Sequence, residues 1–321
     1  MKNYISPVDF IDFYCKLKQK GIKFIWKNFS FFSNNRVQNK WDTFTSLADF
    51  WLIPAVQKRW NLLISNDENC TYEEYTSKKY LNKIQNLNML SIGCGNGNHE
   101  RNFAQFLPNA HFTGIDISKK SIDTAKELAH KEQVNANYLV MDFEKENFTN
   151  ALFDVVLFNA SLHHFKNVEQ TLIKVKNLLK PNGLLIVFEY VGANKLQHSA
   201  EQLKQCNKIL KTLPKKHRIY LGGNFVKTKT YKPGLLRMQI IDPSEAIDSK
   251  NIVNALHKHY KTLEETPLGW NIIQPLFKGI AHHFFKEDKL TKELLLQIFT
   301  LEDNFIKHHP TDAIFGVYGK K

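Results

Sequence analysis

The sequence predicts an α/β fold with a doubly wound, mostly parallel sheet of seven strands. Short apolar segments alternate with helical segments from residue 88 to residue 190, and this alternation is typical of parallel strands joined by crossover helices. The first apolar segment leads directly into three glycines at alternate positions, Gly93, Gly95 and Gly97. A glycine-rich turn between a strand and a helix is where open α/β sheets bind nucleotides.

The individual elements follow from hydrophobic periodicity and from helix-terminating residues. The five core strands are expected at residues 88–92, 111–117, 137–141, 153–159 and 184–190. Helices are expected between them at 101–106, 120–131 and 168–179, the last ending at Pro181-Asn182-Gly183. Residues 261–266 and 313–318 supply the sixth and seventh strands, and the remaining helices are expected at 7–21, 41–65, 75–84, 197–213, 242–260, 270–286 and 289–307.

The composition divides the chain into three regions. Residues 1–70 form a helical, aromatic N-terminal lid whose residues 66–75 read as a polar linker, and residues 71–191 form the nucleotide-binding core. Residues 192–321 contain a basic lid insertion over the substrate, followed by C-terminal helices and the closing strands of the sheet. The aromatic residues of the N-terminal region alternatively serve as ordinary core.

The net charge of +13 is unevenly distributed. Residues 191–240 contain 11 Lys and Arg against 1 acid, whereas residues 61–190 contain 13 against 15. Such a surplus attracts an acidic substrate, nucleic acid or an anionic membrane surface. The alternative is a solvated face with no ligand.

The other compositional signals point to a cytoplasmic protein. The four cysteines, Cys15, Cys70, Cys94 and Cys206, are scattered, so neither a metal site nor a disulfide framework is expected. Charged residues interrupt every apolar stretch, so neither a signal peptide nor a transmembrane segment is expected.

Polar residues stand where the predicted strands end. Ligands bind at the carboxyl ends of strands in a doubly wound sheet. Asp116 closes the second strand and is placed to accept hydrogen bonds from both hydroxyls of a ribose. Asp142 with Phe143 follows the third strand, an arrangement that suits an adenine amine and ring. The end of the fourth strand supplies Asn159 and Ala160, and the fifth supplies Glu189.

These motifs together resemble those of the class I S-adenosylmethionine-dependent methyltransferases, which have a Rossmann-like fold. The matching segments are Leu90-Ser-Ile-Gly-Cys-Gly-Asn-Gly97, Gly114-Ile-Asp-Ile-Ser118, Met141-Asp-Phe143, Phe153-Asp-Val-Val-Leu-Phe-Asn-Ala160 and Leu179-Lys-Pro-Asn-Gly-Leu-Leu185. The resemblance covers residues 75–190 in full.

The resemblance implies a cofactor, S-adenosylmethionine, and the residues that bind it. The three glycines are implied to pass under the methionine and ribose of the cofactor. Asp116 is implied to bind the ribose diol, and the next residue, Ile117, is implied to contact the cofactor as well. Asp142 and Phe143 are implied to hold the adenine, and Asn159 or Ala160 to contact the methionine. Ser91 departs from the family, which usually has an acid there to anchor the methionine ammonium, and Glu100 is the candidate to compensate. A nicotinamide dinucleotide is the less favoured cofactor, because the glycine spacing differs.

Candidate catalytic residues follow the fourth and fifth strands. A sulfonium methyl group is already activated, so a general base is needed only for a hydroxyl nucleophile. His163 and His164 are candidate bases, with Glu189 next; the alternative is that the histidine pair packs against or caps the following helix.

Three functions remain open from the sequence. A methyltransferase acting on an O or N atom of a small-molecule, glycan or peptide substrate with an anionic group is favoured. An RNA methyltransferase is second, since the basic segment suits nucleic acid, although the Asn/Asp-Pro-Pro-Tyr motif of nucleobase amino methylation is replaced by Asn159-Ala-Ser-Leu. A non-catalytic cofactor-binding protein is third.

Overall fold

The computed structural model describes residues 4–20, 49–146, 148, 152–241 and 243–321. Part of the helix expected at 41–65 and the aromatic residues 24–35 therefore lie outside the described residues. The described chain divides into two compact units, each assembled from three separate segments. Unit 1 comprises Met1–Trp60, Gly192–Ala246 and Leu268–Ala313, and unit 2 comprises Asn61–Val191, Ile247–Pro267 and Ile314–Lys321.

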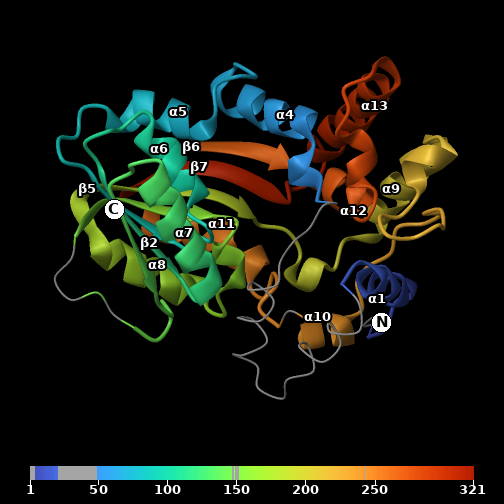
Figure 1. The fold of residues 1–321 in the computed structure, drawn as a ribbon, viewed down its shortest axis with the longest axis horizontal. Helices are drawn as coiled ribbons and strands as arrows, with labels where there is room; N and C mark the ends of the chain where they lie inside the picture. The colour runs from blue at the N-terminus through green and yellow to red at the C-terminus, as the bar shows by residue number, and fades with distance from the viewer. Residues whose placement is uncertain (1–3, 21–48, 147, 149–151, 242) are drawn as a thin grey trace. The chain divides into compact units, whose positions relative to one another are not determined.

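Seven strands of the described chain form one sheet in the order β3-β2-β1-β4-β5-β7-β6 (Figure 1). Their bounds are β1 Asn88–Ile92, β2 His111–Asp116, β3 Ala136–Val140, β4 Phe153–Asn159, β5 Leu179–Tyr190, β6 Tyr260–Gly269 and β7 Ala313–Lys320. The pairs β1–β2, β1–β4, β2–β3 and β4–β5 are parallel. The strand order therefore reverses between β1 and β4, which is the switch point where doubly wound sheets bind ligands. The predicted seven-stranded, mostly parallel fold is confirmed.

Helices of unit 2 cover the sheet because its strands are apolar on both faces. Alternate residues of β1, β4 and β5, such as Leu90, Val156 and Leu185, join one buried cluster. The helices packed into that cluster are α8 (Val168–Leu178) and α11 (Ile252–His259). Successive side chains of a strand point to opposite faces of the sheet. On the other face, Phe188 of β5 contacts the ring of Tyr72 in α5 (Tyr72–Thr76).

The remaining helices of unit 2 are α6 (Asn98–Ala104) and α7 (Lys119–Lys131). The Ser118 hydroxyl caps α7 by accepting a hydrogen bond from the Ser121 amide at 3.1 Å, as the sequence indicates. Several boundaries differ from prediction. Residues 72–75 belong to α5 and not to a linker, and β5 begins at Leu179, so the Pro-Asn-Gly segment expected to end the preceding helix lies within that strand. The helix expected at 242–260 is limited to α11, and the helix expected at 270–286 is limited to residues 273–277, with a short 3-10 turn at 281–284. Residues 235–241, where no helix was expected, are helical.

Unit 1 is mainly helical. Within the described residues, its helices are α1 (Pro7–Lys20), α9 (Ala200–Thr212), α10 (Leu235–Ile241), α12 (Ile273–Phe277) and α13 (Lys289–Ile306), and α4 (Pro54–Ser65) begins in it. An aromatic cluster lies in its core, where the Phe50 ring centroid is 5.9 Å from that of Trp60 and 5.1 Å from that of Trp270. None of the described helices has the length and apolar character needed to cross a bilayer.

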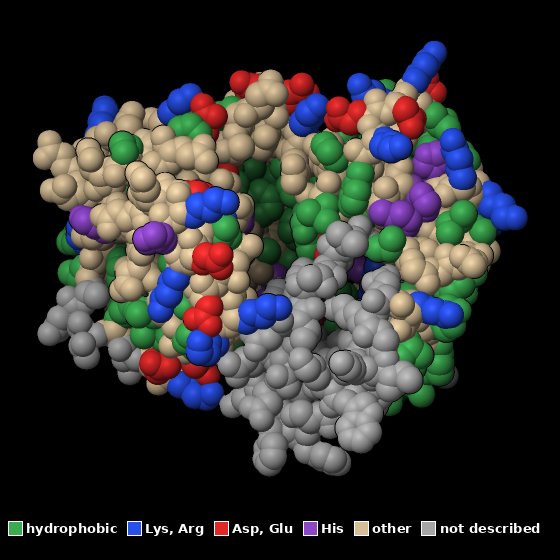
Figure 2. Space-filling view, viewed as in Figure 1, with side chains coloured by type: hydrophobic (Ala, Val, Ile, Leu, Met, Phe, Trp, Pro, Cys, Tyr) green, Lys and Arg blue, Asp and Glu red, His purple; other side chains and the backbone are tan. Residues whose placement is uncertain are grey.

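Charged side chains of both signs are interspersed on the face drawn in Figure 2. Many lysines of unit 2 have acidic partners, for example Lys119 with Asp123 at 2.6 Å and Lys180 with Asp154 at 2.7 Å. Local pairing of this kind reduces the field that a basic protein presents to distant ligands.

Candidate functional site

The glycine loop between β1 and α6 bends through three left-handed residues, with φ of 72° at Gly93, 56° at Gly95 and 72° at Gly97. A Cβ atom on Gly93 would lie 2.6 Å from the Ser161 Cβ, and one on Gly97 would collide with the Tyr138 hydroxyl. Nothing described lies within 4 Å of a Cβ placed on Gly95. Gly93 and Gly97 are therefore required by packing, whereas Gly95 faces open space beside the backbone.

Asp116 binds the glycine loop directly. Its Oδ2 accepts a hydrogen bond from the Gly95 amide at 3.0 Å, and its Oδ1 accepts one from the Ser118 amide at 2.8 Å. The end of β2 is thereby fixed to the turn after β1, and the next residue, Ile117, is half-buried. The structure thus brings together the acid and the glycine loop that the sequence predicted to share a ligand.

Glu100 is a buried acid on α6 with 1% of its surface exposed. Neither carboxylate oxygen forms a hydrogen bond of standard geometry with a described residue. Burial raises the pKa of Glu100, while the nearby Ser91 hydroxyl and His99 favour the charged form. A buried carboxylate with little hydrogen bonding is costly, so this one is suited to a cationic ligand group.

Asp142 and Phe143 follow β3 as predicted. The Asp142 carboxylate accepts hydrogen bonds from the Glu144 amide at 3.1 Å and from Lys145 Nζ at 2.5 Å. The Phe143 ring is buried in the main cluster of unit 2, and Lys174 Nζ lies 4.5 Å from its centroid. Their contact with an adenine stays a prediction, and in this structure both residues stabilise the turn after β3.

Asn159 ends β4 and contacts Tyr72, a residue that the sequence did not indicate. Its Nδ2 donates to the Tyr72 hydroxyl at 2.8 Å, and the same hydroxyl lies 2.9 Å from His99 Nδ1. Burial raises the pKa of Tyr72 well above its usual value, so the hydroxyl stays protonated. Ala160 follows with φ of 48° and donates its amide to the Phe188 carbonyl at 2.8 Å.

The helix that carries Tyr72, but not the contact that Tyr72 makes, could have been identified from the capping pattern before it. The Thr71 side chain accepts a hydrogen bond from the Glu74 amide at 3.3 Å and starts α5. A threonine three residues before a glutamate is a recognised helix start, and it argues against a linker at this point.

Glu189 organises the segment after β4. It is completely buried at the end of β5, and its Oε1 accepts hydrogen bonds from the amides of Ser161 and Leu162. Its Oε2 lies 2.6 Å from His163 Nδ1, and the His163 and His164 ring centroids are 4.2 Å apart. The structure therefore brings the three candidate catalytic residues together, next to the glycine loop that Ser161 contacts at Gly93.

Comparison with known proteins identifies a family for this chain. A family model described as a methyltransferase domain matches residues 83–266. Ubiquinone biosynthesis O-methyltransferase of Rickettsia typhi is 34% identical over 111 residues, which is 34% of this chain and 44% of that protein. The enzyme of the same name from Rickettsia canadensis is 34% identical over 115 residues, covering 36% and 47%. The chain thus spans less than half the length of these curated relatives.

Two solved structures that this chain matches have low sequence identity to it. The plantazolicin methyltransferase BpumL, in complex with a monoazolic desmethylPZN analog and SAH, has 15% identity and a TM-score of 0.42, covering 98% of this chain and 97% of that one. The [4+2]-cyclase SpnF has 14% identity and a TM-score of 0.46, covering 77% and 80%.

Proposed function

Because the chain belongs to the methyltransferase domain family, we propose that it uses S-adenosylmethionine as its methyl donor and that it methylates a hydroxyl oxygen of its substrate. The substrate is a small molecule, glycan or peptide. The observation that carries the proposal is the buried Glu189–His163 pair beside the glycine loop, because a hydroxyl nucleophile needs a base and an amine does not. The basic surplus of residues 191–240 supports an anionic group on the substrate.

The residues of unit 2 fit the cofactor. The open space at Gly95 admits a ligand against the backbone, and the buried, weakly hydrogen-bonded Glu100 carboxylate matches an ammonium group. Asp116 would hold the ribose, Asn159 with Ala160 the methionine, and Asp142 with Phe143 the adenine. When bound, the cofactor supplies an electrophilic methyl group on its sulfonium.

The protein's contribution is to orient a base and exclude water. The Glu189 carboxylate favours the His163 tautomer that carries its proton on Nδ1, which makes Nε2 the basic nitrogen. That nitrogen would accept the proton of the substrate hydroxyl as the oxygen is alkylated. His164 is the second candidate for this step because its ring lies against that of His163.

The experiment measures release of S-adenosylhomocysteine with matched pairs of acceptors, phenols and the corresponding anilines. Phenols should be methylated, and His163→Gln should lower kcat by about a hundredfold or more while the affinity for S-adenosylhomocysteine is retained. The loss should be partly recovered at high pH, where the phenol ionises by itself.

His130→Gln is the matched control, since His130 is exposed on α7 and its replacement should leave kcat unchanged. Methylation of the anilines and not of the phenols would contradict the proposal. A His163→Gln enzyme with normal kcat would also contradict it.

A further inference from the structure

Two polar side chains of unit 2 meet at one hydroxyl group beside the switch point of the sheet. The Tyr72 hydroxyl lies 2.9 Å from His99 Nδ1 and accepts a hydrogen bond from Asn159 Nδ2 at 2.8 Å. Asn159 ends β4, and His99 is the second residue of α6, directly after the glycine loop. The shared hydroxyl therefore holds His99 close to the residue that is expected to contact the methionine part of the cofactor.

A buried acid keeps His99 charged. Glu73 is only 3% exposed, and its Oε1 lies 2.8 Å from His99 Nδ1 and accepts a hydrogen bond from Asn102 Nδ2 at 3.2 Å. Burial raises the pKa of Glu73, but His99 and Asn102 lower it by more. Burial likewise lowers the pKa of His99, but Glu73 and Glu100 raise it by more. The pair is therefore an imidazolium beside a carboxylate, and the imidazolium carries a proton on both ring nitrogens.

The second nitrogen of the His99 ring is open to a ligand. Nε2 has no hydrogen-bonding partner among the described residues, since both contacts of the ring are made by Nδ1. It is also absent from the buried polar atoms that lack a partner, and 31% of the His99 side chain is exposed. A ligand can therefore reach Nε2 and accept a charge-assisted hydrogen bond from it.

The neighbouring cation on α6 is already engaged. Arg101 is only 7% exposed. Its Nε lies 3.1 Å from Glu132 Oε1, and its Nη1 donates to the Asn96 carbonyl at 2.6 Å. His99 is thus the better placed of the two cations to bind an anionic ligand group.

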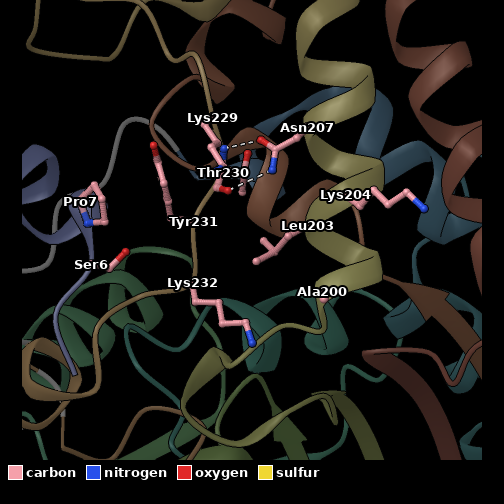
Figure 3. A pocket seen from close by; sticks show the side chains of 10 residues that line it. All are labelled: Ser6, Pro7, Ala200, Leu203, Lys204, Asn207, Lys229, Thr230, Tyr231 and Lys232. Carbon is pink, nitrogen blue, oxygen red and sulfur yellow. Dashed lines mark hydrogen bonds between the residues drawn. The ribbon is translucent and has the colours of Figure 1, made fainter. Parts of the chain in front are cut away.

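Unit 1 also contains unpartnered polar atoms, but a ligand cannot reach them. A cavity of about 430 Å³ lies between the segment that leads into α1, one face of α9 and residues 229–232 (Figure 3). The hydroxyl groups of Ser6 and Thr230 in its wall have no hydrogen-bonding partner among the described residues, yet both are buried. His99 differs from them because its unpartnered nitrogen is open to solvent.

We propose that His99 binds the carboxylate of the methionine part of S-adenosylmethionine. A carboxylate is the anionic group of that part, and it matches the charged Nε2 donor. Glu73 is the positioning residue, because it holds the ring through Nδ1 and directs Nε2 outward. The inference rests on the proposed function for the identity of the cofactor, but not for the hydroxyl acceptor.

The test is calorimetric titration of the full chain at about pH 7 with S-adenosylhomocysteine and with its decarboxylated analogue, which keeps the amine. The wild-type protein should bind S-adenosylhomocysteine at least about tenfold more tightly than the analogue. In His99→Asn the amide nitrogen can still donate to Glu73, but no group replaces Nε2. This variant should bind the two ligands within about twofold of each other, with its affinity for the analogue unchanged.

Glu73→Gln tests the positioning role separately. Without the carboxylate, His99 loses its proton more readily near neutral pH, so the preference for S-adenosylhomocysteine over the analogue should fall at least about threefold. A purely structural role would lower both affinities alike.

The matched control is His111→Asn, the same substitution at an exposed histidine that begins β2, which should leave both affinities within about twofold. The inference is overturned if the wild-type protein binds both ligands equally, or if His99→Asn keeps the wild-type preference. Should His99→Asn also fail to bind the analogue, Glu73→Gln decides, and an unchanged preference there overturns the inference. A wild-type protein that binds neither ligand would overturn the proposed cofactor itself, and the inference with it.

Discussion

At the residue scale, Gly93 and Gly95 share a left-handed backbone but differ in what surrounds them. Gly95→Ala should cost about 1 kcal/mol of stability from its backbone conformation alone, because the added methyl group meets no protein atom. The same methyl group would occupy ligand space, so the affinity for S-adenosylhomocysteine should fall at least about tenfold. Thermal unfolding and calorimetric titration measure the two effects.

Gly93→Ala is the matched comparison for this prediction. Its methyl group would meet the Ser161 Cβ at 2.6 Å, so it should lower the melting temperature clearly more than Gly95→Ala does. Equal melting temperatures, or a Gly95→Ala protein with normal affinity, would show that Gly95 does not face the ligand.

Glu100 should act as the anchor for the cofactor's ammonium group. Glu100→Gln should lower the affinity for S-adenosylhomocysteine about tenfold while leaving the melting temperature equal or higher, because a buried charge with little hydrogen bonding is removed. Methylthioadenosine, which lacks the amino acid, should bind both proteins equally. Because burial raises the pKa of Glu100, wild-type affinity should fall as pH is lowered through that raised pKa, and the variant should not show this dependence.

The control for this prediction is Glu127→Gln, since Glu127 is exposed on α7. Equal losses of affinity for S-adenosylhomocysteine and methylthioadenosine would assign Glu100 a structural role. A lower melting temperature in Glu100→Gln would point the same way.

The glycine loop and Asp116 could be predicted from the sequence because both belong to a local pattern of fixed spacing. Tyr72 could not be predicted, because its significance depends on a contact with Asn159, which lies 87 positions away in the sequence. No periodicity encodes such a pair. The His163–Glu189 contact lies between these cases, since strand ends placed both residues at one edge of the sheet but only the structure gives the hydrogen bond.

At the element scale, α12 begins against a buried acid from α13. Glu302 accepts hydrogen bonds from the amides of Asn271 at 3.0 Å and of Ile272 and Ile273 at 2.9 Å. Burial raises the pKa of Glu302 from 4.5 to about 7, and the backbone donors oppose this rise. The folded state therefore holds a proton that the unfolded state loses between these values.

The sign of the resulting pH effect follows from that proton. The stabilising contribution of Glu302 is fully present below 4.5 and is lost as pH rises through about 7, with a slope of up to about 1.4 kcal/mol per pH unit. Glu302→Gln should flatten the dependence of the melting temperature on pH in this range. Glu293→Gln, on the exposed side of α13, should retain the wild-type slope; an identical slope in Glu302→Gln would refute the assignment.

Element boundaries were less predictable than element types. The strand expected at 153–159 coincides with β4 because it is apolar throughout. The sequence predicts that Pro181-Asn182-Gly183 ends the preceding helix, yet β5 continues through this segment. Pairing of Leu179 with Phe153, the register shift after it and the Lys180–Asp154 ion pair extend the strand backward, and these tertiary contacts override local turn preference.

At the scale of the whole molecule, the doubly wound and mostly parallel character of the sheet could be predicted because alternating strands and helices permit few topologies. The division into two units could not be predicted, because each unit joins three segments that are distant in the sequence. Composition distinguishes only regions that are continuous in the sequence. The uneven distribution of charge could be counted from the sequence. The ion pairs that individual lysines form could not be predicted, since a pair such as Lys79 with Glu264 joins positions 185 residues apart.

The net charge of +13 leads to the last prediction, which separates methyl transfer to a small substrate from action on RNA. Bulk tRNA should bind through its phosphates, and that binding should weaken by orders of magnitude between about 50 and 200 mM salt, because each neutralised phosphate releases a counterion. The bound tRNA should not stimulate release of S-adenosylhomocysteine. Methylation of a phenolic acceptor should change less than about threefold over the same range, since short-range contacts are weakly screened. Release that requires tRNA and falls with salt in parallel with tRNA binding would instead establish RNA as the substrate.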